Sequence, residues 1–566
     1  MSDIQEDIYT KDGTVDYKGR PAIRKKTGNW KACPFILANE CCERLAYYGM
    51  ATNLVNYITT HLNMGNAAAA IAVSNWSGTC YVMPLLGAFV ADSFLGRYIT
   101  IAIFMLIYSL GLSILSLSTT VRALKPSCSN GVCDPTNLQT TTFFVALYMI
   151  ALGTGGIKPC VSSFGADQFD ENDESEKKSK SSFFNWFYLV INIGALIASS
   201  VLVWVQMNIG WTWGFGIPAA AMLVAVFSFL FGTKLYRIQK PGGSPLTRIA
   251  QVIVASFRKF RTKVPDNKAL LYEISDKFAT EGSRKLKHTD QFSFLDKAAV
   301  QILDDKFSMS PWRICTVTQV EEFKTVIRLL PIWASSIVFS AVYGQMPTMF
   351  VLQGNTLDPH IFSGFTIPSA SLSIFDTLSV IIWVPIYDCL IVPIARKFTG
   401  NQRGFTQLTR MGIGLVISIL AMLCAGFLER ARLNRVKELN IYDSSEYVPI
   451  SIFWQVPQYF LIGAAEVFTF IGQLEFFYDQ APDTMRSMCS ALSLTTMSLG
   501  SYLGTLLITI VTYATTRNGQ PGWIPDNLND GKLDYFFFLL GGLSSISFLL
   551  YLMAARWFTY KNADDL

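Results

Sequence analysis

The sequence predicts an all-α membrane protein with twelve transmembrane helices arranged as two six-helix bundles. Of its 566 residues, 51% are hydrophobic and only 15% are charged, whereas soluble domains carry roughly 25% charged residues. Twelve stretches come close to the roughly 20 apolar residues that a helical span requires. A polar segment, residues 237–321, separates these stretches into six and six, which predicts two related halves.

The apolar stretches are long and unbroken and do not alternate with polar residues, so helices are favoured over a β-barrel. The expected spans are 33–60, 68–92, 98–119, 141–165, 182–207, 215–236, 322–352, 367–391, 407–428, 449–475, 487–513 and 533–558. No apolar leader precedes the first span, so no cleaved signal peptide is expected.

These spans imply five parts of the chain: an N-terminal segment 1–32, a first bundle 33–236, a linker 237–321, a second bundle 322–558 and a C-terminal segment 559–566. Lys and Arg gather in the N-terminal segment and the linker, so the positive-inside rule predicts cytoplasmic termini and a cytoplasmic linker. The loop expected at 429–448 is an exception, because it carries four basic residues on the predicted outer side. The charge bias fits the plasma membrane and the vacuolar membrane equally.

Two features lie outside the spans. In the linker, PLTRIAQVIVASFRKFRTKV has apolar residues at helical spacing opposite a basic face, at Ile249, Val252, Ile253, Phe257 and Phe260. This pattern predicts a helix that either lies on the inner membrane surface or serves as a solvated connector. In a predicted outer loop, Cys128 and Cys133 form either a small disulfide or two free thiols.

The first span contains the strongest polar motif. NECCERLAYYGM places five polar side chains on one helical face: Glu40, Glu43, Arg44, Tyr47 and Tyr48. A charge inside a span costs at least ~2.5–3.5 kcal/mol, so each of these charges needs a partner. Glu40 and Arg44 can pair across one helical turn, and Lys158 of the fourth span can serve Glu43. The charges of the two acids and the two cations then sum to zero. The cluster either fixes helix packing or borders a solute cavity, and the two tyrosines favour the cavity.

Four further polar residues lie inside spans. Asn185 and Tyr81 can each contact a solute or a neighbouring helix. In the second half, Asp376 and Glu466 have no cation within one helical turn, so each is either protonated or faces a wet cavity. The first half therefore bears cations and the second half bears acids. This polarity favours a zwitterionic cargo, similar to an amino acid or a peptide.

Several functional classes are not indicated. The chain has no P-loop motif and no clustered Cys/His pattern, and its three histidines fall in expected loops. We therefore expect no enzyme activity, no metal site and no cofactor. The net charge of +5 does not indicate a nucleic-acid partner. With carboxylates in the membrane and no ATPase motif, a proton gradient is the expected source of energy.

Several motifs resemble known families. Glu40-x-x-Glu43-Arg44 followed by Tyr47-Tyr48 resembles the first-helix motif of the proton-coupled oligopeptide transporters, and FNWFYLVINIGAL is similar to their fifth-helix signature. GAFVADSFLGRY resembles the loop between helices 2 and 3 of the major facilitator superfamily. LKHTDQFSFLDKAAV and PWRICTVTQVEEFK resemble the plant nitrate/peptide branch, and GNWKACPFILANECCERLAYYGM resembles its di- and tripeptide carriers.

This resemblance implies a major facilitator fold and proton-coupled symport of di- and tripeptides by alternating access. It implies proton coupling by Glu40, Glu43, Arg44 and Lys158. It implies substrate binding by Lys158 at the peptide carboxylate, by Glu466 and Asp376 at the amino terminus, and by the lining residues Tyr47, Tyr48, Tyr81 and Asn185.

The sequence departs from the family pattern in the seventh span. Gly344 replaces a glutamate of bacterial peptide members, and Tyr343 stands where a plant nitrate carrier has a functional histidine, which argues against nitrate. Thr100 matches a phosphorylated position of that nitrate relative, so a regulatory kinase is a further expected partner, although such a threonine also simply starts a helix. Two alternatives stay open: another cargo (glycoside, alkaloid, hormone or nitrate) and a transport-inactive sensor.

Overall fold

The structure is a computed structural model, and most of the chain is described in it. The described residues are 8–10, 12–129, 132–170, 173–239, 245–265, 267, 270–273, 286, 288–302, 310–362, 364–400, 404–442, 446–481 and 486–558. The expected C-terminal segment 559–566 lies outside the described residues.

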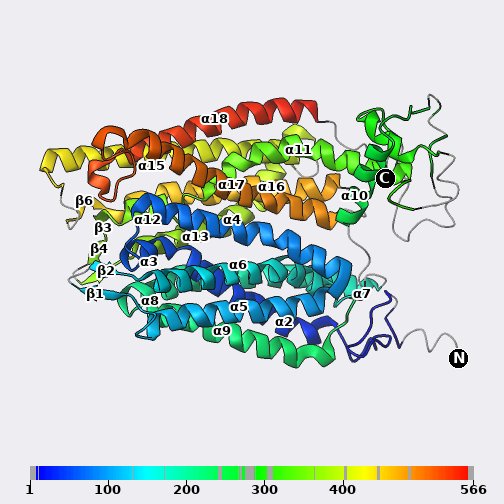
Figure 1. Cartoon of the computed structure of the whole chain (residues 1–566), viewed down its shortest axis with the longest axis horizontal. Helices are drawn as coiled ribbons and strands as arrows, with labels where there is room; N and C mark the ends of the chain where they lie inside the picture. Colours follow the sequence, from blue (N-terminus) through cyan, green and yellow to red (C-terminus); the bar gives the residue numbers. More distant parts are fainter. Residues whose placement is uncertain are drawn as a thin grey trace.

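Helices account for most of the described chain, and they run lengthwise through the molecule (Figure 1). The first half contains α2 (Asn29–Ala51), α3 (Leu54–Thr60), α4 (Asn66–Val90), α5 (Arg97–Thr120), α6 (Asn137–Ala166), α7 (Glu174–Ile197), α8 (Val203–Asn208) and α9 (Trp211–Phe231). The linker contains α10 (Pro245–Arg258). The second half contains α11 (Val317–Tyr343), α12 (Met349–Gly354), α13 (Ile374–Ile386), α14 (Val392–Thr399), α15 (Gln407–Leu439), α16 (Val456–Gln480), α17 (Arg486–Thr515) and α18 (Leu533–Trp557).

In the described part of the chain, the strands are short and form three two-stranded ladders. The pairs are β1 (Ser127–Ser129) with β2 (Val132–Asp134), β3 (Leu357–Asp358) with β6 (Val448–Ser451), and β4 (His360–Phe362) with β5 (Phe365–Thr366). Figure 1 shows them at the end of the molecule opposite the linker. We call these the strand end and the linker end.

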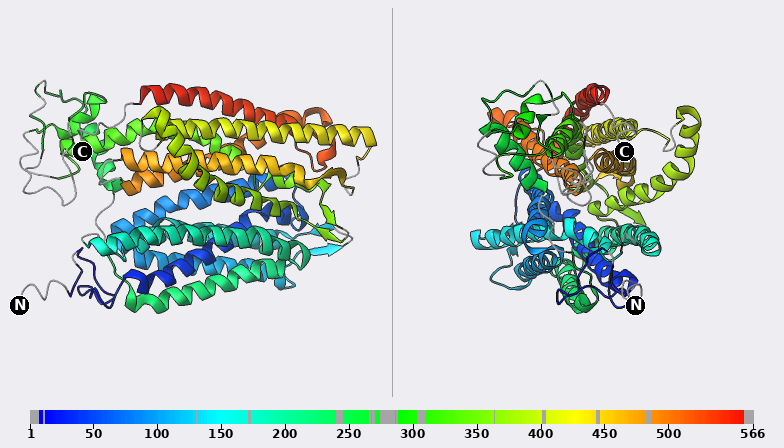
Figure 2. Two further views of the ribbon diagram at one scale, coloured as in Figure 1. Left: turned by 180° about the vertical axis from the view of Figure 1, so that it is seen from behind. Right: turned by 90° about the vertical axis from the view of Figure 1, so that its right-hand side faces the viewer.

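The twelve-helix fold predicted from the sequence is confirmed. Within the described residues, eleven helical segments are long and apolar enough to cross a membrane. The remaining crossing is α2, which has 23 residues but carries Glu40, Glu43 and Arg44 among its apolar side chains. In the end view of Figure 2, the two halves lie side by side as two groups of helices.

Local chemistry sets several helix ends. Thr136 and Thr316 begin α6 and α11 with reciprocal capping boxes, each bonding a Gln three residues later. Gly96, at φ 75°, starts α5 in a backbone conformation that glycine adopts without strain. Turns of π-helix continue α4, α7 and α13 past their α-helical ends, at Ala91–Leu95, Ala198–Leu202 and Tyr387–Ile391.

Three expected boundaries were wrong. The first span is not continuous over 33–60, because α2 ends at Ala51 and α3 begins at Leu54; between them, the side-chain amide of Asn53 donates to Gln206 of α8 at 2.9 Å. The linker expected at 237–321 ends earlier, since α11 already begins at Val317. The loop expected at 429–448 is helical up to Leu439.

The last correction has a clear physical cause. Arg432 is fully buried, and its guanidinium pairs with Glu429 one turn earlier in α15. It also donates to the backbone carbonyl of Leu528 at 3.0 Å. The basic residues that contradicted the positive-inside pattern therefore include one that is held inside the protein. A buried, paired arginine does not report on which side of the membrane a loop lies.

The two halves contact each other along α4 and α17 and again at the strand end. Ser498 of α17 donates to the carbonyl of Gly78 in α4 at 2.8 Å, where a Cβ on the glycine would lie 3.0 Å from the Tyr502 ring. At the strand end, the Asn355 side-chain amide donates to Asn56 of α3 at 2.7 Å. Direct polar contacts therefore join the two halves at mid-length and at the strand end.

Candidate functional site

The charged cluster of α2 is buried in the first half. Arg44 Nε donates to Glu40 Oε1 at 2.7 Å, so the pair expected across one helical turn is present. Arg44 Nε also lies 3.2 Å from Glu43 Oε2, in an ion pair without a hydrogen bond. Both carboxylates are at most 1% exposed, and the Arg44 side chain is 15% exposed. One guanidinium therefore forms ion pairs with two buried acids.

Lys158 of α6 is placed differently from the expectation. Its ammonium lies over the aromatic faces of Tyr47 and Tyr81, 3.7 Å and 4.1 Å from the ring centroids. The Nζ atom is buried, and no residue in the described part of the chain gives it a hydrogen bond or an ion pair. Cation–π attraction, which helix spacing does not reveal, replaces the predicted contact with Glu43.

Aromatic rings hold the lysine in position. The Tyr47 ring lies 5.4 Å from that of Tyr48, 5.7 Å from that of Trp76 and 6.3 Å from that of Tyr81. The Trp76 indole donates to the Leu147 carbonyl of α6 at 3.0 Å, which fixes α4 against α6. Sequence reasoning missed Trp76, because nothing in its local pattern separates it from the other aromatic residues of the spans.

The second half brings Asp376 and Glu466 together, although they appear isolated in the sequence. A Cβ added at Gly463 of α16 would lie 2.7 Å from the Asp376 carbonyl oxygen and 2.7 Å from Ser379 Cβ, so the glycine permits close contact of α13 and α16. Ser379 donates to the Phe460 carbonyl at 2.7 Å. The two acids are near enough for their charges to interact.

Neither acid has a basic partner among the residues that the structure describes. Asp376 is 7% exposed, and its Oδ1 atom is buried without a hydrogen bond. Glu466 is half-buried and lies beside the Tyr343 hydroxyl at the end of α11.

Two tyrosines connect the halves of the site. Tyr343 lies near Glu466 and Asp376 of the second half and near Tyr48 and Tyr81 of the first half. Tyr188 of α7, which is 54% exposed, is within electrostatic range of both Glu466 and Arg44. Sequence reasoning missed Tyr188, although it belongs to the FNWFYLVINIGAL motif. The side chain of Asn185, in the same motif, lies outside the described residues.

Three other predicted residues lie away from this site. Cys128 and Cys133 are joined as a disulfide in the β1–β2 hairpin at the strand end. Thr100 is fully buried, and its hydroxyl donates to the Gly96 carbonyl at 2.9 Å. A kinase would reach Thr100 only if the start of α5 opened, so regulation there stays a prediction.

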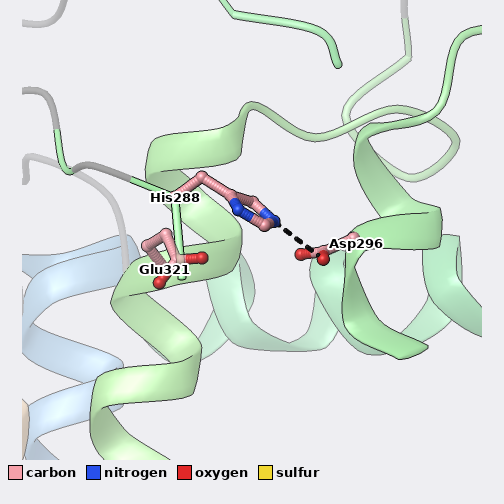
Figure 3. Close-up of side chains that lie close together, drawn as sticks. All are labelled: His288, Asp296 and Glu321. Atoms are coloured by element: carbon pink, nitrogen blue, oxygen red, sulfur yellow. Dashed lines mark hydrogen bonds and ion pairs between the residues drawn. The ribbon is translucent and has the colours of Figure 1, made fainter. Parts of the chain in front are cut away.

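A second cluster of polar groups lies at the linker end (Figure 3). His288 Nε2 is 2.9 Å from Asp296 Oδ2, and Glu321 of α11 lies beside them. Lys324 Nζ contacts Asp296 at 2.7 Å and Glu321 at 2.8 Å. The lysine therefore supplies the positive charge between the two acids. The cluster fastens the linker to α11.

The comparisons with known proteins agree with this architecture. The family model described as "PTR2: POT family" matches residues 98–524, well over half of the chain. The chain belongs to the POT family. Among POT family relatives of Arabidopsis thaliana, Protein NRT1/ PTR FAMILY 8.1 is 64% identical over 564 residues, covering 99% of each chain. Protein NRT1/ PTR FAMILY 8.3 is 60% identical, covering 99% of this chain and 96% of the relative.

Solved structures of the POT family share the fold. An auto-inhibited POT family peptide transporter gives a TM-score of 0.68 at 23% identity, covering 94% of this chain and 98% of that one. The POT family transporter PepTSo gives 0.67 at 24% identity, covering 93% and 97%. The POT family member described here is accordingly a multi-pass integral membrane protein with the fold of transporters and not of enzymes.

Proposed function

We propose that this protein is a proton-coupled symporter of di- and tripeptides. The observation that carries the proposal is the charge arrangement of the two halves. Lys158 has no acidic partner in the described residues, and Asp376 and Glu466 have no basic one. A peptide zwitterion carries the two complementary groups, so its carboxylate would bind Lys158 and its ammonium would bind the acids.

The aromatic contacts of Lys158 suit reversible binding of a carboxylate. A cation–π contact contributes about 0.5–2 kcal/mol, whereas a hydrogen bond to a charged group contributes about 1.5–3 kcal/mol. An incoming carboxylate can therefore draw the ammonium from Tyr47 and Tyr81. We assign these two tyrosines, with Tyr48 and Asn185, to the lining of the substrate site.

The shared guanidinium of α2 suits proton coupling. Glu40 and Glu43 both depend on Arg44, with Lys158 as the second cation nearby. A proton on either acid would leave Arg44 to the other, so the positive charge of Lys158 would no longer be needed to balance the cluster and would be open to the substrate carboxylate. A ligand shifts a conformational equilibrium only by its differential affinity for the two states. A zwitterion that touches both halves would have such a differential and would favour closure around itself.

The same proposal includes topology and location. We assign the linker end, with both termini, to the cytoplasm, and the strand end to the outer side. The Lys and Arg bias supports this orientation, and so does a disulfide at the strand end, since disulfides persist in oxidising compartments. The plasma membrane and the vacuolar membrane both meet these conditions.

The test is uptake by the full-length protein in proteoliposomes with an imposed pH gradient. Wild type should accumulate Ala-Ala and discriminate against both its N-acetyl and its C-terminal amide derivatives. Lys158→Gln should lose only the discrimination against the amide, and Glu466→Gln only that against the N-acetyl form. Lys234→Gln and Glu438→Gln, which change exposed residues away from the site, are the matched controls.

Other outcomes would decide against the proposal. Equal transport of free and N-acetylated peptide by wild type would remove the acids as amine receivers. Uptake of nitrate or of a plant metabolite that Ala-Ala cannot compete with would identify another cargo. Absence of uptake of any of these solutes would favour a sensor.

A further inference from the structure

The linker is a folded unit packed on the second half. Val252 and Ala255 of α10 are buried against Leu295 and Ala298 of the short 3-10 helix Ser293–Ala299. The buried ammonium of Lys259 donates to the Val300 carbonyl at 2.6 Å. Part of the apolar face that the sequence predicts for a membrane surface is therefore used inside the protein.

Other aromatic side chains of the linker are exposed. Phe257 is 77% exposed, Phe260 67%, Phe294 58% and Trp312 40%. They come from three stretches of chain: the end of α10, the 3-10 helix and the turn before α11. Contiguous exposed apolar surface on a folded unit marks an interaction site more often than isolated exposed residues do.

Basic residues connect these aromatic side chains into one surface. Lys297 Nζ donates to the Phe260 carbonyl at 2.6 Å, and it lies one 3-10 turn after Phe294, on the same face. The Arg258 guanidinium donates to the Trp312 carbonyl at 3.5 Å. We define the linker patch as the following eight residues: Phe257, Arg258, Phe260, Arg261, Phe294, Lys297, Trp312 and Arg313.

The linker patch is positively charged. Arg258, Arg261 and Arg313 are exposed, and Lys297 is half-buried. Asp296, the acid of the 3-10 helix, is buried; it pairs with Lys324 at 2.7 Å and bonds His288 at 2.9 Å, and Figure 3 shows the contact with His288. It therefore does not neutralise this surface.

The chain connections keep the linker patch near the membrane. α10 begins ten residues after Leu235, which ends the last crossing of the first half, and α11 begins at Val317. Figure 2 shows the green linker segment at the edge of the molecule in the end view, outside the centre of the helix bundle. A surface in this position lies beside the headgroups that surround the protein.

We propose that the linker patch docks on the adjacent membrane leaflet and binds anionic phospholipid headgroups. Aromatic rings prefer the headgroup level of a bilayer, and basic side chains next to a span are attracted to the anionic lipids of the cytoplasmic leaflet. The four aromatic rings and four basic side chains of the linker patch therefore match both the headgroup level and the negative charge of the cytoplasmic leaflet. An apolar protein partner would not explain the basic residues.

Hydrogen exchange of the full-length protein in nanodiscs tests the proposal. Single proteins are placed in discs of phosphatidylcholine with or without phosphatidylserine, and exchange is followed in peptides from 245–265 and 288–302. Protection is expected to rise with phosphatidylserine, about fivefold for each basic side chain engaged, and to fall again in high salt. Phe257→Ser with Phe260→Ser, and Arg258→Gln with Arg261→Gln, should each reduce the gain.

The controls separate lipid binding from folding and from transport. Arg435→Gln at the strand end and Tyr17→Ser in the N-terminal segment should respond to phosphatidylserine as wild type does. Ala-Ala uptake is measured in parallel in proteoliposomes. If the proposed transport fails, the lipid result can still be interpreted. Equal protection in both lipid mixtures overturns the proposal. Discs loaded with two proteins are measured alongside; protection that appears only in those discs would identify a second copy of the chain as the occupant and would also overturn the proposal.

Discussion

The two halves of the candidate site differ in how their acids are neutralised. In the first half, Glu40 and Glu43 both contact Arg44 of the same helix, and Lys158 of α6 is a second positive charge nearby. In the second half, Asp376 and Glu466 approach each other, and no basic residue in the described chain pairs with either. One half supplies its own counter-charge, and the other does not.

This difference indicates what each half is suited to do. A buried carboxylate requires a cation, a proton or water to be tolerated in a membrane. The first half can exchange partners among its own residues when a proton arrives. The second half must obtain a positive charge from outside, from a proton or from the amino group of a substrate. Loss of charge should therefore affect stability in opposite directions in the two halves.

The largest effect is expected for Arg44→Gln. It leaves Glu40 and Glu43 buried with Lys158 as the nearest cation, and breaking a buried ion pair by removing one partner costs about 3–5 kcal/mol. The variant should unfold at a clearly lower temperature in detergent, and it should not drive uptake. Thermal unfolding followed by tryptophan fluorescence, together with proteoliposome uptake, measures both effects.

A double variant identifies the cause of that loss. Glu40→Gln combined with Arg44→Gln removes one acid and one cation, so most of the stability should return while proton coupling stays lost. If the double variant is as unstable as Arg44→Gln alone, the guanidinium acts through packing and not through charge balance.

Local geometry explains what the sequence could predict. Glu40 and Arg44 are one helical turn apart, and any helix over that stretch places them together. The number of crossings also follows from local hydropathy, and so does the presence of α10. These features require no knowledge of which helices are neighbours in space.

Contacts between distant segments could not be predicted in the same way. The position of Lys158 requires α4 to bring Tyr81 beside α2 and α6. The approach of Asp376 to Glu466 depends on Gly463 of α16, which lets α16 pack closely against α13. The helical extension of α15 to Leu439 likewise depends on Arg432 reaching residues almost a hundred positions away. Such contacts depend on the packing of the whole bundle, and no local residue spacing in the sequence indicates them.

A smaller and opposite effect is expected for Asp376→Asn in the second half. The substitution removes a buried carboxylate that lacks a basic partner, so thermal stability should be unchanged or higher. The KM for Ala-Ala should rise about tenfold, equivalent to about 1.4 kcal/mol of lost binding. Asp388→Asn, which changes an exposed acid farther along the same crossing, is the matched control. A marked fall in the unfolding temperature of Asp376→Asn would show that a cation of the protein neutralises this acid. The second half would then have its own counter-charge, as the first half does.

The smallest effect is the change of stability with pH that is expected at a fully partnered acid outside the spans. Burial alone would raise the pKa of Glu176, but its hydrogen bond to Arg237 at 2.7 Å, the Asp170 N–H and Arg24 outweigh burial and hold that pKa below its ordinary value. Because the pKa is lower in the folded state, the stabilisation is complete above the unfolded pKa near 4.5 and is lost as the pH falls through the folded value.

Wild type should therefore lose stability between about pH 5 and the acid limit of folding, and Glu176→Gln should show a flatter profile there. Glutamine keeps an acceptor oxygen for Arg237 and for the Asp170 N–H but leaves the buried guanidinium of Arg237 without its counter-charge, so at neutral pH the substitution should also lower stability. Denaturant unfolding at several pH values measures the difference. Parallel pH profiles for the two proteins would mean that other carboxylates dominate acid unfolding and that a well-partnered acid at the linker end contributes little.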